Sequence, residues 1–262
     1  AVASAGFLAL AGGFFARALY VGDGESTPLA ALWAVAAVPF LPVFAALLTM
    51  RLVADERASG RLDLLLTAPI RERDVVLGKL LGALSVLVVN LALYLLVPLI
   101  VLPFCAPALG DAISLGAFLP AFAALLLQGL LWCATGLLAS ACFRHAASAA
   151  FASLLLMLAL PYALFAGATA WAPVLRARYA SIPFEVHIID LSTGLVPFAS
   201  LVFYLALTCF AVFAATKAVA GLRLRGRAAR GLRGSTAFVT LLAFVFTCLV
   251  VAFAMRLDFT FE

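Results

Sequence analysis

The stretch RLVADERASGRLDLLLTAPIRERDVVLGK, residues 51–79, separates two long apolar runs in the first half of the chain. It carries six of the seventeen Lys and Arg residues and five of the twelve Asp and Glu residues. Within it, Leu62, Leu65 and Leu66 follow the i, i+3, i+4 spacing of a helix with one apolar face. Pro69 ends this pattern, because its ring clashes with the preceding turn and it has no N–H group to donate. We therefore predict a structured, charged connector rather than a passive loop.

The composition of the chain is that of a membrane protein. Of its 262 residues 67% are hydrophobic and 11% are charged, and the mean hydropathy is +1.22. A soluble domain has about 25% charged residues. A membrane span needs roughly 20 apolar residues, and backbone groups in lipid must be satisfied within the span, which favours helices. We expect an all-α membrane protein, a polytopic helical bundle.

Six apolar runs are long enough to be membrane spans, and a seventh follows a basic segment. The six expected spans lie at about residues 1–20, 28–50, 80–104, 116–143, 147–171 and 196–220. The seventh is expected at 235–255, within the final segment 235–262. Pro39 and Pro42 predict a kink or break in the second span, and Pro161 predicts a break in the fifth.

Two connections between these spans have a distinctive composition. Arg144 and His145 form a very short polar turn between the fourth and fifth spans. Residues 172–197 are too apolar for a free loop and too charged for a span, so we expect a short re-entrant or interfacial element before the sixth span. Because the first residue is Ala rather than Met, we also expect further residues before it in the native protein.

The connector resembles that of a known membrane protein family. E-R-x-S-G-R-L-D-L-L-L-T-A-P-I followed by V-V-L-G-K is similar to the connector of type-2 ABC exporter permeases, most closely those of gliding-motility and nitrous-oxide-type systems. Two positions depart from the pattern, Arg61 in place of Thr and Asp63 in place of Glu. The positions that match are Glu56, Gly60, Leu62, Leu64, Leu65, Leu66, Thr67, Pro69, Gly78 and Lys79.

This resemblance implies a permease domain over residues 1–222, with 51–79 as the element that couples it to a partner ABC ATPase. The implied ATPase-contacting residues are Glu56, Arg57, Gly60, Arg61, Leu62, Asp63, Leu65 and Leu66. The leucines would fill an apolar groove on the ATPase, and the charged residues would form its polar rim. From spacing alone, an amphipathic helix lying in the lipid headgroup layer explains the pattern equally well.

The resemblance also implies partners and a function. The chain would be the membrane subunit of an ATP-driven exporter, paired with a second permease copy or homologue and surrounded by membrane lipid. ATP and Mg²⁺ would be bound by the partner ATPase and no cofactor by this chain, which has no phosphate-binding G-x-x-x-x-G-K-(S/T) loop and is not expected to be an enzyme. The net charge of +5 does not indicate nucleic acid, because cationic loops are usual in inner-membrane proteins.

The distribution of Lys and Arg predicts the orientation. With the connector in the cytoplasm, thirteen Lys and Arg residues lie on the cytoplasmic side and four on the other. A basic linker at 223–234, with five arginines from Arg223 to Arg233, then also faces the cytoplasm. We expect a multi-pass protein of the bacterial inner membrane, with segment 221–234 cytoplasmic and the C-terminus outside.

The final segment, 235–262, lies beyond the six spans that complete the permease pattern. Its exit resembles that of the first span of the gliding-motility partner subunit, which implies a fusion leading to an extracytoplasmic domain; a simple extra anchor is the other interpretation. An alternative function follows, in which the chain relays ATPase motion to an extracytoplasmic domain without moving a solute. A secondary carrier is a third hypothesis, weakened by the lack of paired intramembrane acids.

Few residues suggest chemistry within the spans. Asn90, Gln128 and Thr135 are the polar groups placed deepest, and they are candidates for lining a translocation path or for hydrogen bonds between helices. Gly136 and Ser140 form a small-xxx-small pair that permits close helix packing. The five cysteines are scattered and the two histidines lie far apart, so no metal site is predicted.

Overall fold

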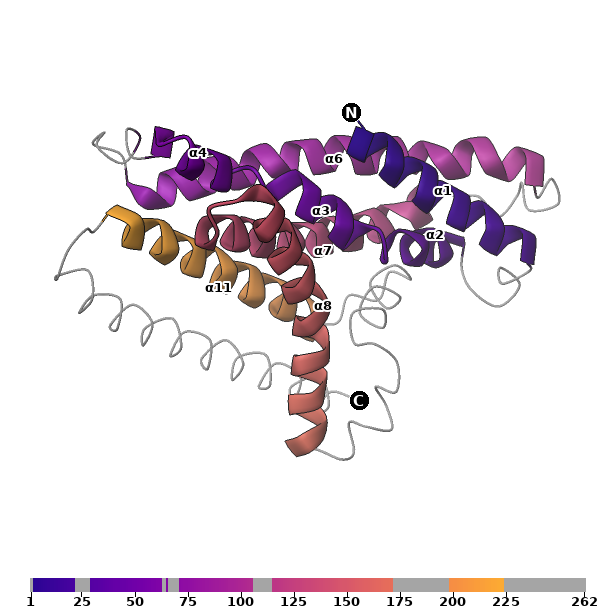
Figure 1. Cartoon of the computed structure of the whole chain (residues 1–262). Helices are drawn as coiled ribbons and strands as arrows, with labels where there is room; N and C mark the ends of the chain where they lie inside the picture. Colours follow the sequence, from indigo (N-terminus) through magenta and orange to yellow (C-terminus); the bar gives the residue numbers. More distant parts are fainter. Residues whose placement is uncertain are drawn as a thin grey trace.

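The computed structural model describes residues 2–21, 29–62, 65, 71–105, 115–171 and 198–223 (Figure 1). Among these residues the regular secondary structure is entirely helical. The helices are α1 (Val2–Val21), α2 (Leu29–Ala37), α3 (Leu41–Thr49), α4 (Ala54–Ala58), α6 (Glu72–Cys105), α7 (Leu115–Cys142), α8 (Ala146–Trp171) and α11 (Phe198–Arg223). The expected element at 172–197 and the segments 224–234 and 235–262 lie outside the described residues.

Helix α7 is the centre of the bundle. It packs against α2, α3, α6, α8 and α11, and it also contacts the short helix α4. Its apolar residues Leu125, Leu131 and Leu137 are almost completely buried. By contrast, α1 and α6 leave large apolar side chains exposed along their length, among them Leu10, Leu81 and Ile100. A helix that is apolar on its outer as well as its inner face suits lipid rather than water.

Several helices have the length and composition of membrane spans. Within the described residues four single helices qualify: Val2–Tyr20, Glu72–Ile100, Phe118–Cys142 and Ser200–Leu222. The bent pair formed by Leu29–Ala37 and Leu41–Ala58 would make a fifth. Helix α8 coincides with the expected span at 147–171, and Figure 1 shows it running away from the bundle, across the direction of α6 and α11. The chain is therefore a multi-pass helical membrane protein.

The expected break in the second span is confirmed. Helices α2 and α3 are bent by 44° to each other at the turn that contains Pro39. Pro42 lies at the start of α3, where its fixed φ suits a helix beginning and its missing N–H would have had no intrahelical partner. The two prolines thus end one helix and begin the next.

The expected break at Pro161 is wrong. The backbone of α8 is helical without interruption from Ala146 to Trp171, through Pro161. Helix α7 likewise contains Pro120. A single proline removes one N–H group, and membrane helices tolerate this because local adjustments and neighbouring groups satisfy the freed carbonyl.

An aromatic pair fixes α2, the first half of the broken span. Trp33 of α2 and Tyr94 of α6 stack with ring centroids 4.8 Å apart. Trp33 Nε1 donates a hydrogen bond to the Tyr94 carbonyl (3.3 Å), and the Tyr94 hydroxyl donates one to the Trp33 carbonyl (3.0 Å). Both side chains are fully buried, so each polar tip has its partner inside the bundle. This pair joins α2 firmly to α6.

Helix α3, the second half of the broken span, lies against α7 at a glycine. Thr49, at the end of α3, faces Gly136 of α7 so closely that a Cβ atom at Gly136 would overlap the Thr49 hydroxyl. The hydroxyl itself donates to the Ala45 carbonyl (2.7 Å), which restricts its movement. Gly136 is therefore required for the close approach of α3 and α7.

We predict that Gly136→Ala lowers the stability of the folded protein by about 1–3 kcal/mol, the usual effect of overpacking a filled core. Gly82→Ala is the control, because a Cβ there meets nothing within 4 Å and alanine favours a helix over glycine by up to ~1 kcal/mol. Thermal unfolding in detergent should show a melting temperature below that of the wild-type protein for Gly136→Ala. The melting temperature of Gly82→Ala should not fall. Equal stability of the two variants would contradict the close contact.

Candidate functional site

The connector begins with α4, a helix of only five residues. Helix α4 lies at one end of the bundle, together with the start of α6 and the end of α11 (left in Figure 1). An isolated helix of this length is far too short to be stable in water. Its position must therefore be set by contacts with the longer helices, and three sets of polar contacts do this.

The first set comes from Ser140 of α7. Its hydroxyl oxygen accepts hydrogen bonds from the backbone N–H groups of Val53 (3.0 Å) and Ala54 (3.1 Å). The same hydroxyl donates to the Met50 carbonyl (3.0 Å), just after α3 ends. One buried side chain thus joins the end of α3, the start of α4 and the body of α7.

The second set comes from Arg57 of α4. Its guanidinium donates to the backbone carbonyls of Ala141 (3.3 Å) and Cys142 (3.0 Å). These are the last carbonyls of α7, which have no partner within their own helix. A cation is also favoured at this position by the partial negative charge of a helix C-terminus. Arg57 therefore attaches α4 to the end of α7.

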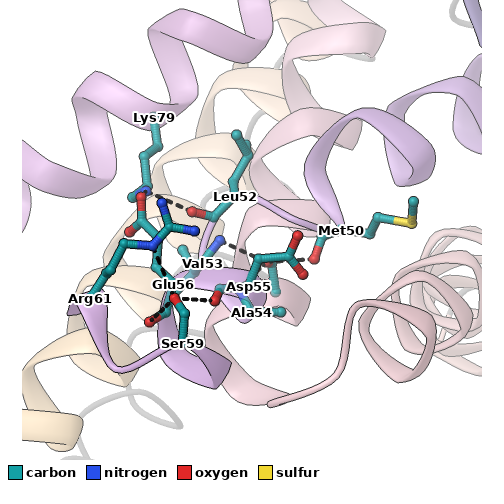
Figure 2. A network of polar contacts seen from close by, with 10 residues as sticks. Met50, Leu52, Val53, Ala54, Asp55, Glu56, Ser59, Arg61 and Lys79 are labelled. Carbon is teal, nitrogen blue, oxygen red and sulfur yellow. Dashed lines mark hydrogen bonds and ion pairs between the residues drawn. The ribbon is translucent and has the colours of Figure 1, made fainter. Parts of the chain in front are cut away.

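The third set comes from Lys79 of α6. Its ammonium group donates to the Leu52 carbonyl (2.6 Å) and forms an ion pair with Glu56 Oε1 (2.6 Å). The Lys79 side chain is only 15% exposed, and that of Glu56 is 33% exposed, so water screens this pair less than a typical surface pair. Lys79 thus attaches the other side of α4 to α6 (Figure 2).

A tight turn after α4 presents polar groups to the outside. Gly60 has φ = +74°, a left-handed conformation that glycine adopts without strain, and it ends the helix. The Ser59 hydroxyl donates to the Asp55 carbonyl (2.8 Å), and Arg61 Nε donates to Ser59 Oγ (3.1 Å). These contacts shape an exposed tip, which we define as Asp55, Ala58, Ser59, Gly60 and Arg61.

The connector leucines are placed differently from the expectation. Leu62 is only 2% exposed and belongs to the core of the bundle, so it is not an exposed anchor for a partner. Leu65 is partly buried and packs against the same core. Leu66 and Asp63 lie outside the described residues. The helical spacing of Leu62, Leu65 and Leu66 stays a prediction, and Leu62 serves the attachment of the connector to its own bundle.

The polar residues expected deep in the spans are all buried. Thr135 Oγ1 donates to the carbonyl of Trp132 (3.0 Å), and Asn90 Nδ2 donates to that of Val86 (2.8 Å), each within its own helix. Asn90 Oδ1 and Gln128 Oε1 have no hydrogen-bond partner among the described residues. A translocation path lined by Asn90, Gln128 and Thr135 stays a prediction.

Sequence reasoning missed the role of Ser140. Its only signal was the small-xxx-small spacing with Gly136, which indicates close packing but not a hydrogen bond to another segment. Lys79 and Arg57 were visible within the connector, yet their partners are backbone carbonyls, which no side-chain pattern reveals. In the part of the chain that the structure describes, no group of His, Cys, Asp and Glu could hold a metal ion.

We predict that Lys79→Met loosens α4 more than Glu56→Gln does. Methionine removes both the bond to Leu52 and the ion pair, whereas glutamine can still accept a hydrogen bond from Lys79. A hydrogen bond to a charged group contributes about 1.5–3 kcal/mol, so the amides of Arg57 and Ser59 should exchange at least about tenfold faster in Lys79→Met. Hydrogen exchange measures this, with Arg73→Met, at an exposed position of α6, as the control. Unchanged exchange in Lys79→Met would show that α4 does not depend on α6.

A comparison with protein-family models identifies the family of the chain. The model of the ABC-2 family transporter protein matches residues 18–259. The match includes residues 235–255, which we had expected to lie outside the permease, and it gives no support to a gliding-motility subgroup or to a fusion. Curated proteins gave no match. Because the family match covers most of the 262 residues, the chain belongs to the ABC-2 transporter family and is a permease subunit of an ABC transporter.

Proposed function

We propose that this permease couples ATP hydrolysis by a separate ABC ATPase to the export of a substrate, and that the connector is where the two subunits meet. The observation that supports this most strongly is the attachment of α4 to two long helices. Polar contacts join it to α7 through Ser140 and Arg57 and to α6 through Lys79. A short helix bound to two spans in this way is suited to receive a force and pass it on.

The orientation of the charges supports a cytoplasmic connector. Thirteen of the seventeen Lys and Arg residues lie on the connector side if the spans alternate, and this side of an inner-membrane protein normally faces the cytoplasm. An ABC ATPase, with its ATP and Mg²⁺, would then meet the connector from the cytoplasm. We place the protein in the bacterial inner membrane on the same grounds.

The surface that would contact the ATPase is the exposed tip of the connector. Asp55, Ser59 and Arg61 are exposed, whereas Leu62 is buried in the bundle. We therefore assign the contact to polar and charged groups around the Gly60 turn, with Leu65 at its margin. Charged groups at such a surface contribute to orientation and to partner selection more than to affinity.

Force on the tip would spread through α7. This helix contacts α2, α3, α6, α8 and α11, so a shift of its connector end displaces the packing of the whole bundle. Close-packed helices change between discrete arrangements rather than deforming continuously. Pairing with a second permease copy or homologue would bring two such bundles together, and the exposed apolar residues of α1 and α6 are available for lipid or for that second copy.

We predict that Arg61→Glu strongly reduces capture of the ATPase. The native protein, purified in mild detergent from cells that express its own partners, should bring an ABC ATPase with it in stoichiometric amount. Reversing the charge at the tip should reduce the recovered ATPase about tenfold or more, because like charges across an interface are strongly unfavourable. Quantitative mass spectrometry gives the ratio.

Arg17→Glu is the matched control, since Arg17 is an exposed arginine near the end of α1, and that end lies on the opposite side of the bundle from α4 (Figure 1). It should retain the ATPase. Absence of any ATPase from the wild-type preparation would contradict the proposed function. Full recovery with Arg61→Glu would contradict the assignment of the contact surface.

A further inference from the structure

We propose that Ser140 is the positioning residue that makes the connector move together with α7. This inference rests on the proposed function, because it concerns how motion of the ATPase would reach the spans. Ser140 does not belong to the connector and does not lie in the exposed tip. It is fully buried in α7, two residues before that helix ends.

The hydrogen bonds of Ser140 use its whole capacity. A hydroxyl group has one hydrogen to donate and two lone pairs to accept. Ser140 donates to Met50 and accepts from Val53 and Ala54, at 3.0–3.1 Å. The partners are 86 to 90 positions away in the sequence, so these bonds connect separate parts of the chain rather than neighbouring turns.

Ser140 supplies what α4 cannot supply for itself. The first N–H groups of a helix lack intrahelical partners and are usually satisfied by the side chain of the N-cap residue. The N-cap of α4 is Val53, which has no such side chain and makes no capping hydrogen bond. The hydroxyl that accepts the N–H groups at the start of α4 is therefore carried by α7. The beginning of the connector helix forms on the surface of another helix.

Two other serines of the bundle, Ser148 and Ser153, bond within their own part of the chain. Ser148 donates to the His145 carbonyl, and Ser153 donates to the Ala150 carbonyl, both within a few residues. One turn before Ser140, Gly136 allows the end of α3 to approach α7. That close approach brings Met50 and Val53 within reach of the short serine side chain. Gly136 and Ser140 thus act together, the first by its size and the second by its hydroxyl.

The three bonds join α3, α4 and α7 into one mechanical unit. Arg57 adds a second attachment to α7, but its guanidinium is at the end of a long, flexible side chain, whereas the serine hydroxyl is one carbon from the backbone. Without the hydroxyl, α4 would still be held by Lys79 to α6 and would still present its tip. The ATPase would bind, and its motion would no longer reach α7 in full.

The test is a distance measurement in the complex of the chain with its ATPase. Nitroxide labels are placed at Ala58, on the exposed side of α4, and at His145, in the exposed turn that follows α7, in a background without other reactive cysteines. Pulsed electron–electron double resonance gives the distribution of distances between the two labels. It is measured without nucleotide and with a non-hydrolysable ATP analogue and Mg²⁺. In the labelled protein that keeps Ser140, we expect one narrow distance distribution that is the same with and without the analogue.

In Ser140→Ala we expect the distribution to broaden and to shift when the analogue binds, because α4 follows the ATPase while α7 stays behind. The recovered ATPase should remain within about twofold of the wild-type amount, since the tip is unchanged. Ser140→Thr, which keeps the hydroxyl, should restore the narrow distribution, and Ser153→Ala, which removes a bond within α8, should have no effect. A narrow, nucleotide-independent distribution in Ser140→Ala would overturn the proposal.

Two further outcomes keep this inference separate from the proposed function. If no ATPase is captured by the wild-type chain, the proposed function fails, and the width of the distribution in the isolated chain still tests Ser140. If Ser140→Ala does not accumulate as folded protein, amide hydrogen exchange of the wild-type chain tests the proposal instead. The N–H groups of Val53 and Ala54 should then exchange at least about tenfold more slowly than that of Asp55, which has no capping acceptor; equal rates would overturn the proposal.

Discussion

The Ser140 hydroxyl lies where the end of α3, the start of α4 and the side of α7 meet, and the position of the connector depends on it. A helix of five residues has too few internal hydrogen bonds to be stable alone, so its order depends on contacts with neighbouring helices. Ser140 and Arg57 provide this order by bonding backbone groups that a helix end leaves unpaired. Lys79 adds to it by bonding the Leu52 carbonyl in the turn before α4 and by pairing with Glu56. The connector is thereby part of the bundle and not a loop attached to it.

The same physical constraint shapes the rest of the bundle. In a membrane, apolar contacts with other helices and with lipid are similar in strength, so close approach and buried polar contacts decide which helices pack together. Trp33 and Tyr94 fix α2 to α6 by two reciprocal hydrogen bonds, while Thr49 and Gly136 fix α3 to α7 by close approach. The bend at Pro39 lies between these two attachments. The α2 half of the broken span is therefore bonded to α6 as well as packed against α7, and the α3 half, with the connector, is attached to α7.

Much of this architecture follows from the sequence. The apolar runs predicted the helices, the charges of 51–79 predicted the connector, and Pro39 with Pro42 predicted the broken span. Periodicity could not tell which way Leu62 faces, because in so apolar a chain the inner and outer faces of a helix look alike. The break expected at Pro161 did not occur, since one missing N–H is tolerated in a membrane helix. The role of Ser140 could not be predicted, because its partners are backbone groups brought close by packing.

The measurement that tests this account most directly is site-specific photo-crosslinking in living cells, with a benzophenone amino acid at Ala58 in the tip and, for comparison, at Leu81 on the exposed apolar side of α6. We expect a covalent adduct between position 58 and an ABC ATPase, and no such adduct from position 81. An ATPase adduct from position 81 but not from position 58, or none from either with the protein folded in the membrane, would contradict the claim that this connector is where ATP-driven motion enters the bundle.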